Sequence, residues 1–155
     1  MKNIDEKYMR IALLEAKKAE MEDEVPVGCI IVKDDKIIAR GHNKKENSKS
    51  ALAHAEILTI KKASKKLDAW RLNECTLYVT LEPCPMCAGA ILESRIGRVV
   101  YGVEETKMGA LGSSFNLFAQ KNLNHHPIIL GGVLKDECKE ILTSYFKNKR
   151  NKINK

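Results

Sequence analysis

The first twenty residues show apolar side chains at the spacing of an amphipathic helix. They recur three or four positions apart at Ile4, Tyr8, Ile11, Ala12, Ala16 and Ala19. Because this spacing gathers them on one side of an α-helix, the segment is predicted to pack one face against a core. Further helices are predicted over residues 53–65 and 85–94, with a short one over 115–119 and a C-terminal one from Lys135.

Short runs rich in β-branched and aromatic residues alternate with these helices. They cover residues 27–32, 36–40, 76–80, 98–102 and 128–130, and Asp34-Asp35 predicts a tight turn between the first two. Strands that alternate with helices indicate an α/β fold with one sheet covered on both faces. Since no repeat, linker or shift of composition interrupts residues 1–155, we expect a single domain.

Composition narrows the class of protein. Of 155 residues, 44% are hydrophobic and 30% charged, which is typical of a globular protein. No stretch of 18 apolar residues occurs, so no membrane partner is expected, and the charged N-terminus without an apolar signal stretch predicts a cytoplasmic location. The net charge of +7, with five cations and no acid over residues 147–155, favours a polyanionic partner.

One imidazole, two thiols and a carboxylate form the pattern with the clearest chemistry. His54-Ala55-Glu56 is followed by Pro83-Cys84-Pro85-Met86-Cys87. His54, Cys84 and Cys87 supply three ligands of the kinds that zinc prefers, which leaves a fourth position for water and Glu56 to move protons. Both cysteines and His54 are expected at the first turns of two helices, so two helix N-termini can converge on one Zn²⁺ per subunit.

Other interpretations of these residues remain open. A Cys-x-x-Cys pair alone also occurs in redox proteins. A structural zinc would need a fourth ligand, which His42, His125, His126 or another cysteine could supply. The remaining cysteines, Cys29, Cys75 and Cys138, are expected to be small core residues.

Longer blocks around the zinc motif resemble the bacterial tRNA-specific adenosine deaminase family (TadA), within the cytidine-deaminase-like superfamily. The resemblance extends over nearly the whole chain and is carried by residues 24–28, 41–43, 53–57, 70–72, 76–90, 95–102, 107–113 and 124–125. It implies a three-layer α/β/α cytidine deaminase-like fold with a mixed five-stranded sheet, and a homodimer. The implied reaction is the hydrolytic deamination of the wobble adenosine to inosine in a tRNA anticodon loop.

The resemblance also implies roles for single residues. His54, Cys84 and Cys87 correspond to the zinc ligands and Glu56 to the proton shuttle, while Asn43 corresponds to a residue that binds the target nucleoside. The implied contacts of the base and of the anticodon loop are Val27, Leu81, Glu105, Lys107, Asn124, His125, Tyr145, Phe146 and Arg150.

Two positions depart from the family's usual residues. Glu105 stands where Asp is common, and Tyr145 where Phe is frequent, which preserves a ring for stacking. Packing and RNA contact are both open roles for Tyr145 and Phe146.

Three other functions compete with tRNA deamination. A deaminase of a free base, nucleoside or nucleotide, of the cytosine or guanine type, would carry the same zinc motif. A non-catalytic zinc protein that binds RNA would not need Glu56. The chain could also be the catalytic half of a heterodimer, although it holds all four site residues itself.

Overall fold

A mixed five-stranded sheet forms the centre of the computed structural model, which describes residues 2–153. Its strand order is β2-β1-β3-β4-β5. β1 pairs antiparallel with β2 and β3, whereas β3, β4 and β5 are parallel. The strands are β1 (Gly28–Lys33), β2 (Lys36–His42), β3 (Thr76–Leu81), β4 (Arg98–Val103) and β5 (Ile128–Leu130).

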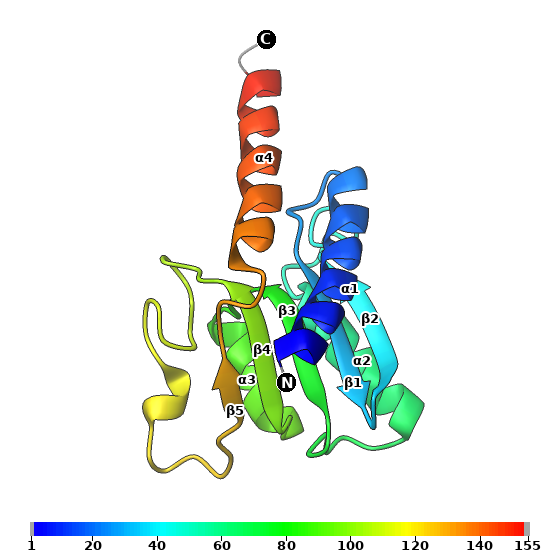
Figure 1. The fold of residues 1–155 in the computed structure, drawn as a ribbon, viewed down its shortest axis with the longest axis vertical. Coiled ribbons are helices and arrows are strands. Elements are labelled where there is room, and N and C mark those ends of the chain that lie inside the picture. The colour runs from blue at the N-terminus through cyan, green and yellow to red at the C-terminus, as the bar shows by residue number, and fades with distance from the viewer. Residues whose placement is uncertain (1, 154–155) are drawn as a thin grey trace.

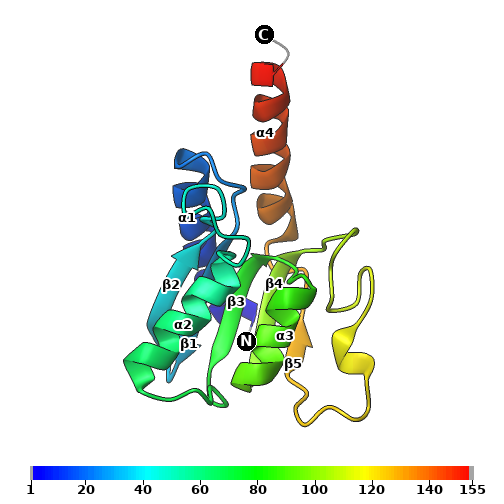
Figure 2. The same ribbon diagram turned by 180° about the vertical axis from the view of Figure 1, so that it is seen from behind.

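Helices cover both faces of this sheet. α1 and α4 lie on one face (Figure 1), and α2 and α3 lie on the other (Figure 2). The helices are α1 (Lys2–Met21), α2 (Ala55–Leu67), α3 (Pro85–Ser94), the 3₁₀ turn η1 (Leu117–Ala119) and α4 (Lys135–Ile153). This arrangement confirms the expected three-layer α/β/α fold with its mixed five-stranded sheet.

The interior strand β1, which lies between β2 and β3, is buried on both sides. Cys29 and Ile31 belong to the core beneath α2 and α3, and Ile30 and Val32 belong to the core beneath α1 and α4. Because successive side chains of a strand point to opposite faces, a strand covered on both faces needs an unbroken apolar run. This explains the sequence over 27–32, which lacks the alternation of a half-exposed strand.

Two local features position β1. Asp34 and Asp35 both have positive φ angles, 50° and 59°, as a two-residue turn with the twist of a hairpin requires. At the other end, a Cβ at Gly28 would lie 2.0 Å from the carbonyl oxygen of Ala12, so only glycine lets α1 approach this closely.

The expected elements are present, with shifted boundaries. β2 continues beyond Arg40 because Gly41 and His42 still pair with β1. The helix expected from residue 53 begins at Ala55, since His54 has extended backbone angles and is its N-cap. The short helix is a 3₁₀ turn over Leu117–Ala119, where the Asn116 side chain accepts a hydrogen bond from the backbone N–H of Phe118.

The second half of the C-terminal helix is not covered by the rest of the described chain. Beyond Tyr145 its residues up to Ile153 are exposed, and Figure 1 shows this part of α4 projecting away from the sheet. Residues 154–155 of the basic tail lie outside the described part of the chain. Within residues 2–153 no helix combines the length and apolar character needed to cross a bilayer.

Candidate active site

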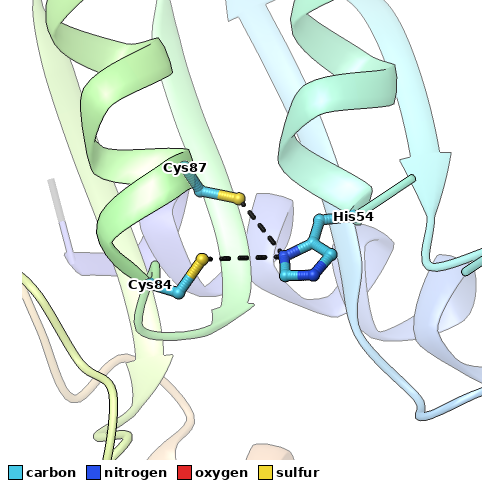
Figure 3. A group of neighbouring side chains, drawn as sticks. All are labelled: His54, Cys84 and Cys87. Atoms are coloured by element: carbon cyan, nitrogen blue, oxygen red, sulfur yellow. Dashed lines mark hydrogen bonds between the residues drawn. The ribbon is translucent and has the colours of Figure 1, made fainter. Parts of the chain in front are cut away.

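Two helices on the same face of the sheet begin close to each other. His54 is the N-cap of α2. Cys84 is the N-cap of α3, and Pro85 follows it as the first residue of that helix. Cys87 follows in the first turn of α3, so its sulfur lies beside that of Cys84 (Figure 3). The helix N-termini carry partial positive charge, which favours thiolate over thiol at this point.

The donor atoms of these three residues fit a tetrahedral metal ion. His54 Nδ1 lies 3.7 Å from Cys84 Sγ and 3.5 Å from Cys87 Sγ, and all three donors lie within 4.8 Å of one another. Two ligands of tetrahedral zinc with Zn–N of about 2.05 Å and Zn–S of about 2.3 Å are about 3.6 Å apart. The residues therefore fit one zinc ion, with Nδ1 as the nitrogen donor.

The pKa values of the two thiols are shifted in opposite directions. Hydrogen bonding with Cys87, together with the His54 ring, lowers the pKa of the Cys84 thiol to about 4. The same bond raises the pKa of Cys87, and a hydrogen bond with Cys84 raises that of His54. At least one sulfur is thus a thiolate at neutral pH, the form that binds zinc.

Glu56 lies in the first turn of α2, two residues after His54. Only 4% of it is exposed, and burial raises the pKa of its carboxyl to about 7, with the negative charge of Cys84 acting in the same direction. A carboxyl whose pKa is close to neutrality can both accept and release a proton. Buried carboxyls with raised pKa values are also enriched at functional sites.

A cavity of about 570 Å³ opens onto this group. This volume is in the range of small-molecule sites. Four residues expected from the sequence to bind substrate, Val27, Asn43, Leu81 and Glu105, line it together with His54, Glu56 and Cys84. The rest of its wall comes from Val25, Lys45, Ala51, Ala55, Glu82, Pro85, Met86 and Met108.

Other expected RNA contacts lie outside this cavity. Lys107 is exposed on the same loop as Glu105, and Asn124 and Arg150 are exposed farther along the chain. The His125 ring is 2.6 Å, through Nε2, from the carbonyl oxygen of Ile96. For these four residues RNA contact stays a prediction.

The two neighbouring aromatic residues of α4 differ in their surroundings. Tyr145 is buried, and its hydroxyl donates to the backbone oxygen of Asp23 at 3.2 Å and accepts from Lys149. Phe146 is 45% exposed and lines a second cavity of about 520 Å³. That cavity shares Val25, Leu81 and Glu105 with the first, so the two cavities adjoin. Tyr145 packs within the chain, whereas Phe146 offers its ring to the surface.

The histidines considered as a fourth metal ligand have other partners. His42 lies 3.3 Å from Glu15 and 3.0 Å from Glu22, and His126 is 3.0 Å from the carbonyl oxygen of Gln120. Among residues 2–153, the potential metal group consists of His54, Cys84 and Cys87. Cys29, Cys75 and Cys138 are buried away from it, as expected.

Two buried carboxylates that the sequence analysis did not single out hold the loops around the cavity. Glu82 accepts hydrogen bonds from the backbone N–H groups of Glu105, Leu111 and Ser113. Glu24 accepts from the N–H groups of Glu46 and Asn47. Both lie in stretches that carry the family resemblance, but an acid beside an apolar or proline-containing stretch is too common to predict such a role.

Comparison with known proteins gives one family. Residues 2–103 match the model of the cytidine and deoxycytidylate deaminase zinc-binding region. The chain is 48% identical over 148 residues to the tRNA-specific adenosine deaminase of Bacillus subtilis (strain 168), covering 96% of this chain and 92% of that protein. It is 46% identical over 147 residues to the tRNA-specific adenosine deaminase of Haemophilus influenzae, with 94% and 85% covered.

Solved structures agree with this assignment. One from a study of A-to-I editing by tRNA:A34 deaminases at the wobble position of transfer RNA superimposes with a TM-score of 0.85 at 43% identity, covering 88% of this chain and 99% of that one. A guanine deaminase from Nitrosomonas europaea gives a TM-score of 0.79 at 25% identity, covering 90% and 83%. The chain belongs to the cytidine and deoxycytidylate deaminase family and, within it, to the tRNA-specific adenosine deaminases.

Proposed function

We propose that this protein is a zinc-dependent hydrolase that deaminates the wobble adenosine of a tRNA anticodon loop to inosine. The observation that carries the proposal is the three-donor group of His54, Cys84 and Cys87, with the buried Glu56 beside it, at a cavity large enough for one nucleoside. The tRNA-specific adenosine deaminases among its relatives support this choice of substrate.

Each residue of the group has a separate part in the reaction. His54 Nδ1 and the two sulfurs would hold zinc, and zinc bound there supplies Lewis acidity that makes water a better nucleophile. Glu56 takes a proton from the attacking water and returns it to the adenine ring nitrogen. Once water has added to the carbon that bears the exocyclic amine, Glu56 takes the remaining proton from the new hydroxyl group and delivers it to that amine. The C–N bond then breaks, the hydroxyl oxygen becomes the carbonyl oxygen of inosine, and ammonia leaves.

Asn43 retains the capacity to bind the target nucleoside. Its Nδ2 donates to the carbonyl oxygen of Val25 at 3.2 Å, and its Oδ1 accepts from the N–H of Lys45 at 3.1 Å. A side-chain amide has two N–H donors and two acceptor lone pairs, so one of each remains. Since these bonds fix its orientation, Asn43 can form hydrogen bonds with the nucleoside with little loss of conformational entropy. Val27 and Leu81 are proposed to pack against the base.

The neighbouring nucleotides would lie outside the first cavity. Glu105 lines both cavities, which supports its proposed contact with the nucleotide next to the target. The exposed ring of Phe146 offers a stacking face in the adjoining cavity. Lys107, Asn124, His125 and Arg150 are proposed to contact the anticodon loop, and Tyr145 to support Phe146, whose ring packs against it edge to face.

Deamination of defined substrates tests the proposal. The purified zinc-loaded protein is incubated with an anticodon stem-loop that carries adenosine at the wobble position, with the same stem-loop carrying guanosine there, and with free nucleosides and bases. We expect inosine only at the wobble adenosine. Mapping of inosine in total tRNA after exposure to the protein then identifies which tRNAs are accepted. Conversion of free bases without conversion of the stem-loop would overturn the proposal.

A free purine base is the second candidate substrate. The similarity to guanine deaminases, including one from Bacillus subtilis at 38% identity with a TM-score of 0.64, favours testing it. In the same assay, release of ammonia from free guanine would identify this activity, because the stem-loop contributes no free base.

Three wider features are proposed with the function. Residues 1–155 form one domain whose basic C-terminal helix begins near residue 135. The protein is a homodimer with one zinc ion per subunit, as the family resemblance implies, and it acts in the cytoplasm. Light scattering coupled to gel filtration, with zinc content per chain, tests the homodimer.

A further inference from the structure

We infer that Glu82 is a positioning residue that fixes residues 104–113 as one wall of the substrate cavity. The inference rests on the proposed function, because it concerns how that cavity receives the RNA. Glu82 stands directly between Leu81, the last residue of β3, and Pro83-Cys84, which leads into α3 and ends at its N-cap. One short segment therefore holds three groups: Leu81, which lines the cavity, the carboxylate of Glu82, and the metal donor Cys84.

The carboxylate of Glu82 is enclosed by donors from this loop. Oε1 accepts from the N–H of Glu105 at 3.1 Å and from the hydroxyl of Ser113. Oε2 accepts from the N–H of Leu111 at 2.9 Å and from that of Ser113 at 3.2 Å. Only 2% of Glu82 is exposed. Since an ionised carboxylate has about four acceptor sites, all of them are used within the protein.

The loop packs closely around this carboxylate. Residues 104–113 belong to no helix or named strand, and their backbone is tied to the start of α3 by one bond, from the N–H of Ala110 to the carbonyl oxygen of Pro83 at 2.9 Å. A Cβ at Gly109 would lie 2.6 Å from the carboxyl carbon of Glu82. The loop is thus shaped around Glu82, which satisfies backbone groups that regular structure would otherwise satisfy.

This clamp sets the position of two residues at the cavity. Glu105 and Met108 both line it, together with Asn43 and Val27, which are proposed to bind the target nucleoside. The N–H of Glu105 is one of the three held by Glu82, so the clamp fixes the backbone where Glu105 enters the cavity wall. Glu82 itself has no acceptor left for a substrate, so its effect on the reaction passes through the loop.

Replacement of Glu82 by glutamine should loosen one end of the loop selectively. If the amide nitrogen takes the place of Oε2, two N–H groups lose their acceptor. If it takes the place of Oε1, only the N–H of Glu105 loses its acceptor, since the Ser113 hydroxyl can turn and accept instead. The second orientation costs less free energy because it leaves fewer buried N–H groups without an acceptor, and it releases the backbone at Glu105.

Steady-state kinetics of zinc-loaded Glu82→Gln on the anticodon stem-loop test the inference. We expect KM to rise about tenfold and kcat to stay within about twofold, the pattern of lost substrate binding without loss of transition-state chemistry. Hydrogen exchange of the Glu105 amide should accelerate about tenfold, with zinc content unchanged. Ser113→Ala, which removes one of the four bonds and no backbone anchor, should change KM in the same direction by about twofold.

Asp5→Asn is the matched control, because Asp5 is an equally buried carboxylate with three hydrogen bonds on the other face of the sheet. It should lower stability and leave KM unchanged. An unchanged KM in Glu82→Gln, or a loss of kcat alone, would overturn the inference. If Glu82→Gln does not fold, Ser113→Ala carries the test, and an unchanged KM there overturns it. Wild-type protein inactive on the stem-loop would instead overturn the proposed function.

Discussion

At the scale of single residues, Glu56 is the group proposed to carry protons in the reaction. It is buried beside the metal donors, and it is an acid whose pKa, about 7, allows either protonation state near neutrality. A non-catalytic zinc protein that binds RNA has no need of a buried acid in this position, because burial of a carboxyl beside a thiolate costs free energy. The proposed role of Glu56, which is to carry protons between water and the base, would account for this cost in free energy.

Glu56→Gln should abolish most turnover while substrate and zinc remain bound. The amide has the same shape and cannot accept a proton from water, so we expect the rate of inosine formation to fall by about 10²–10⁴-fold. The rate on the anticodon stem-loop, zinc content by atomic absorption and RNA binding by fluorescence anisotropy are measured together. Glu20→Gln, at an exposed position of α1, is the control. Activity within tenfold of wild type would contradict the role of Glu56.

The sequence predicted the donors of this site but not its supporting bonds. Residue type and spacing were enough to predict the group of His54, Cys84 and Cys87, because metal chemistry restricts both. The role of Glu56 beside them stays a prediction. The choice of Nδ1 as the donor atom depends on where α2 lies relative to α3, which no local pattern encodes. The role of Glu82 depends on a loop more than twenty residues away in the chain, so it became visible only in three dimensions.

At the scale of elements, α1 is held on the sheet by a buried ion pair. Asp5 receives two hydrogen bonds from Arg98 of β4, at 2.8 and 2.7 Å, and one from the hydroxyl of Tyr78 of β3 at 2.7 Å. Asp5 is 2% exposed. Because the guanidinium approaches with both nitrogens, the contact fixes the orientation of α1 as well as its distance from the sheet.

Asp5→Asn should lower the free energy of unfolding by about 3 kcal/mol at pH 7, because it leaves the Arg98 charge poorly paired in a low-dielectric setting. Arg98 holds the pKa of Asp5 below its ordinary value, so the pair stabilises the fold fully above the unfolded pKa of about 3.9. That contribution disappears as the pH falls through the lower folded pKa. The difference between variant and wild type should therefore shrink below about pH 4.

Urea unfolding followed by circular dichroism at pH 7 and at pH 3.5 measures this difference. Arg10→Gln is the control, since Arg10 and Glu137 form a 3.9 Å pair in which both side chains are about half exposed. Its effect should stay below about 0.5 kcal/mol. An Asp5→Asn effect that is equally small, or that grows as the pH falls, would contradict this account of α1.

The metal group joins α2 to α3, so zinc should stabilise the fold as well as serve the reaction. Removal of zinc by a chelator should abolish activity and lower Tm by about 10 °C. This is the stabilisation that zinc gives when its free concentration exceeds its Kd about a thousandfold. Zinc should restore both, and magnesium should restore neither, because one imidazole and two thiolates suit zinc. Cys84→Ser should show the lower Tm without a response to zinc, and a zinc-dependent rise in its Tm would contradict the assignment.

The helices and strands could be predicted because the spacing of apolar residues differs between the two kinds of element. The helical spacing of apolar residues predicted α1 to within two residues at each end, and the β5 strand was predicted without error. The errors fall at element ends, where tertiary contacts decide. His54 was expected inside a helix and is its N-cap, with ψ near 152°. That extended backbone directs its ring toward the thiols, so the functional requirement explains the error.

At the scale of the whole molecule, the active-site cavity and the projecting half of α4 belong to one surface. The second cavity extends from Glu105, at the edge of the first, to Phe146 and to Lys135 and Lys139 of α4. Past Phe146 the helix is exposed and mostly basic, and it projects beyond the sheet (Figure 1). A tRNA whose anticodon loop enters the first cavity would place its phosphates along this helix. Cations there would neutralise phosphates and release counterions, which strengthens binding of the RNA.

Neutralisation of this helix should therefore weaken RNA binding without affecting chemistry. In a triple variant with Lys147→Gln, Arg150→Gln and Lys152→Gln, we expect KM for the stem-loop to rise about tenfold at 0.15 M salt and kcat to be unchanged. The slope of log KM against log salt should fall by about two to three, one for each lost phosphate contact. The matched control neutralises three exposed cations of α2, Lys61, Lys65 and Lys66, and gives the same net charge. If both triple variants lose affinity equally, only the overall charge matters and the position of α4 does not. If the α4 variant alone loses affinity, the basic helix is part of the tRNA-binding surface.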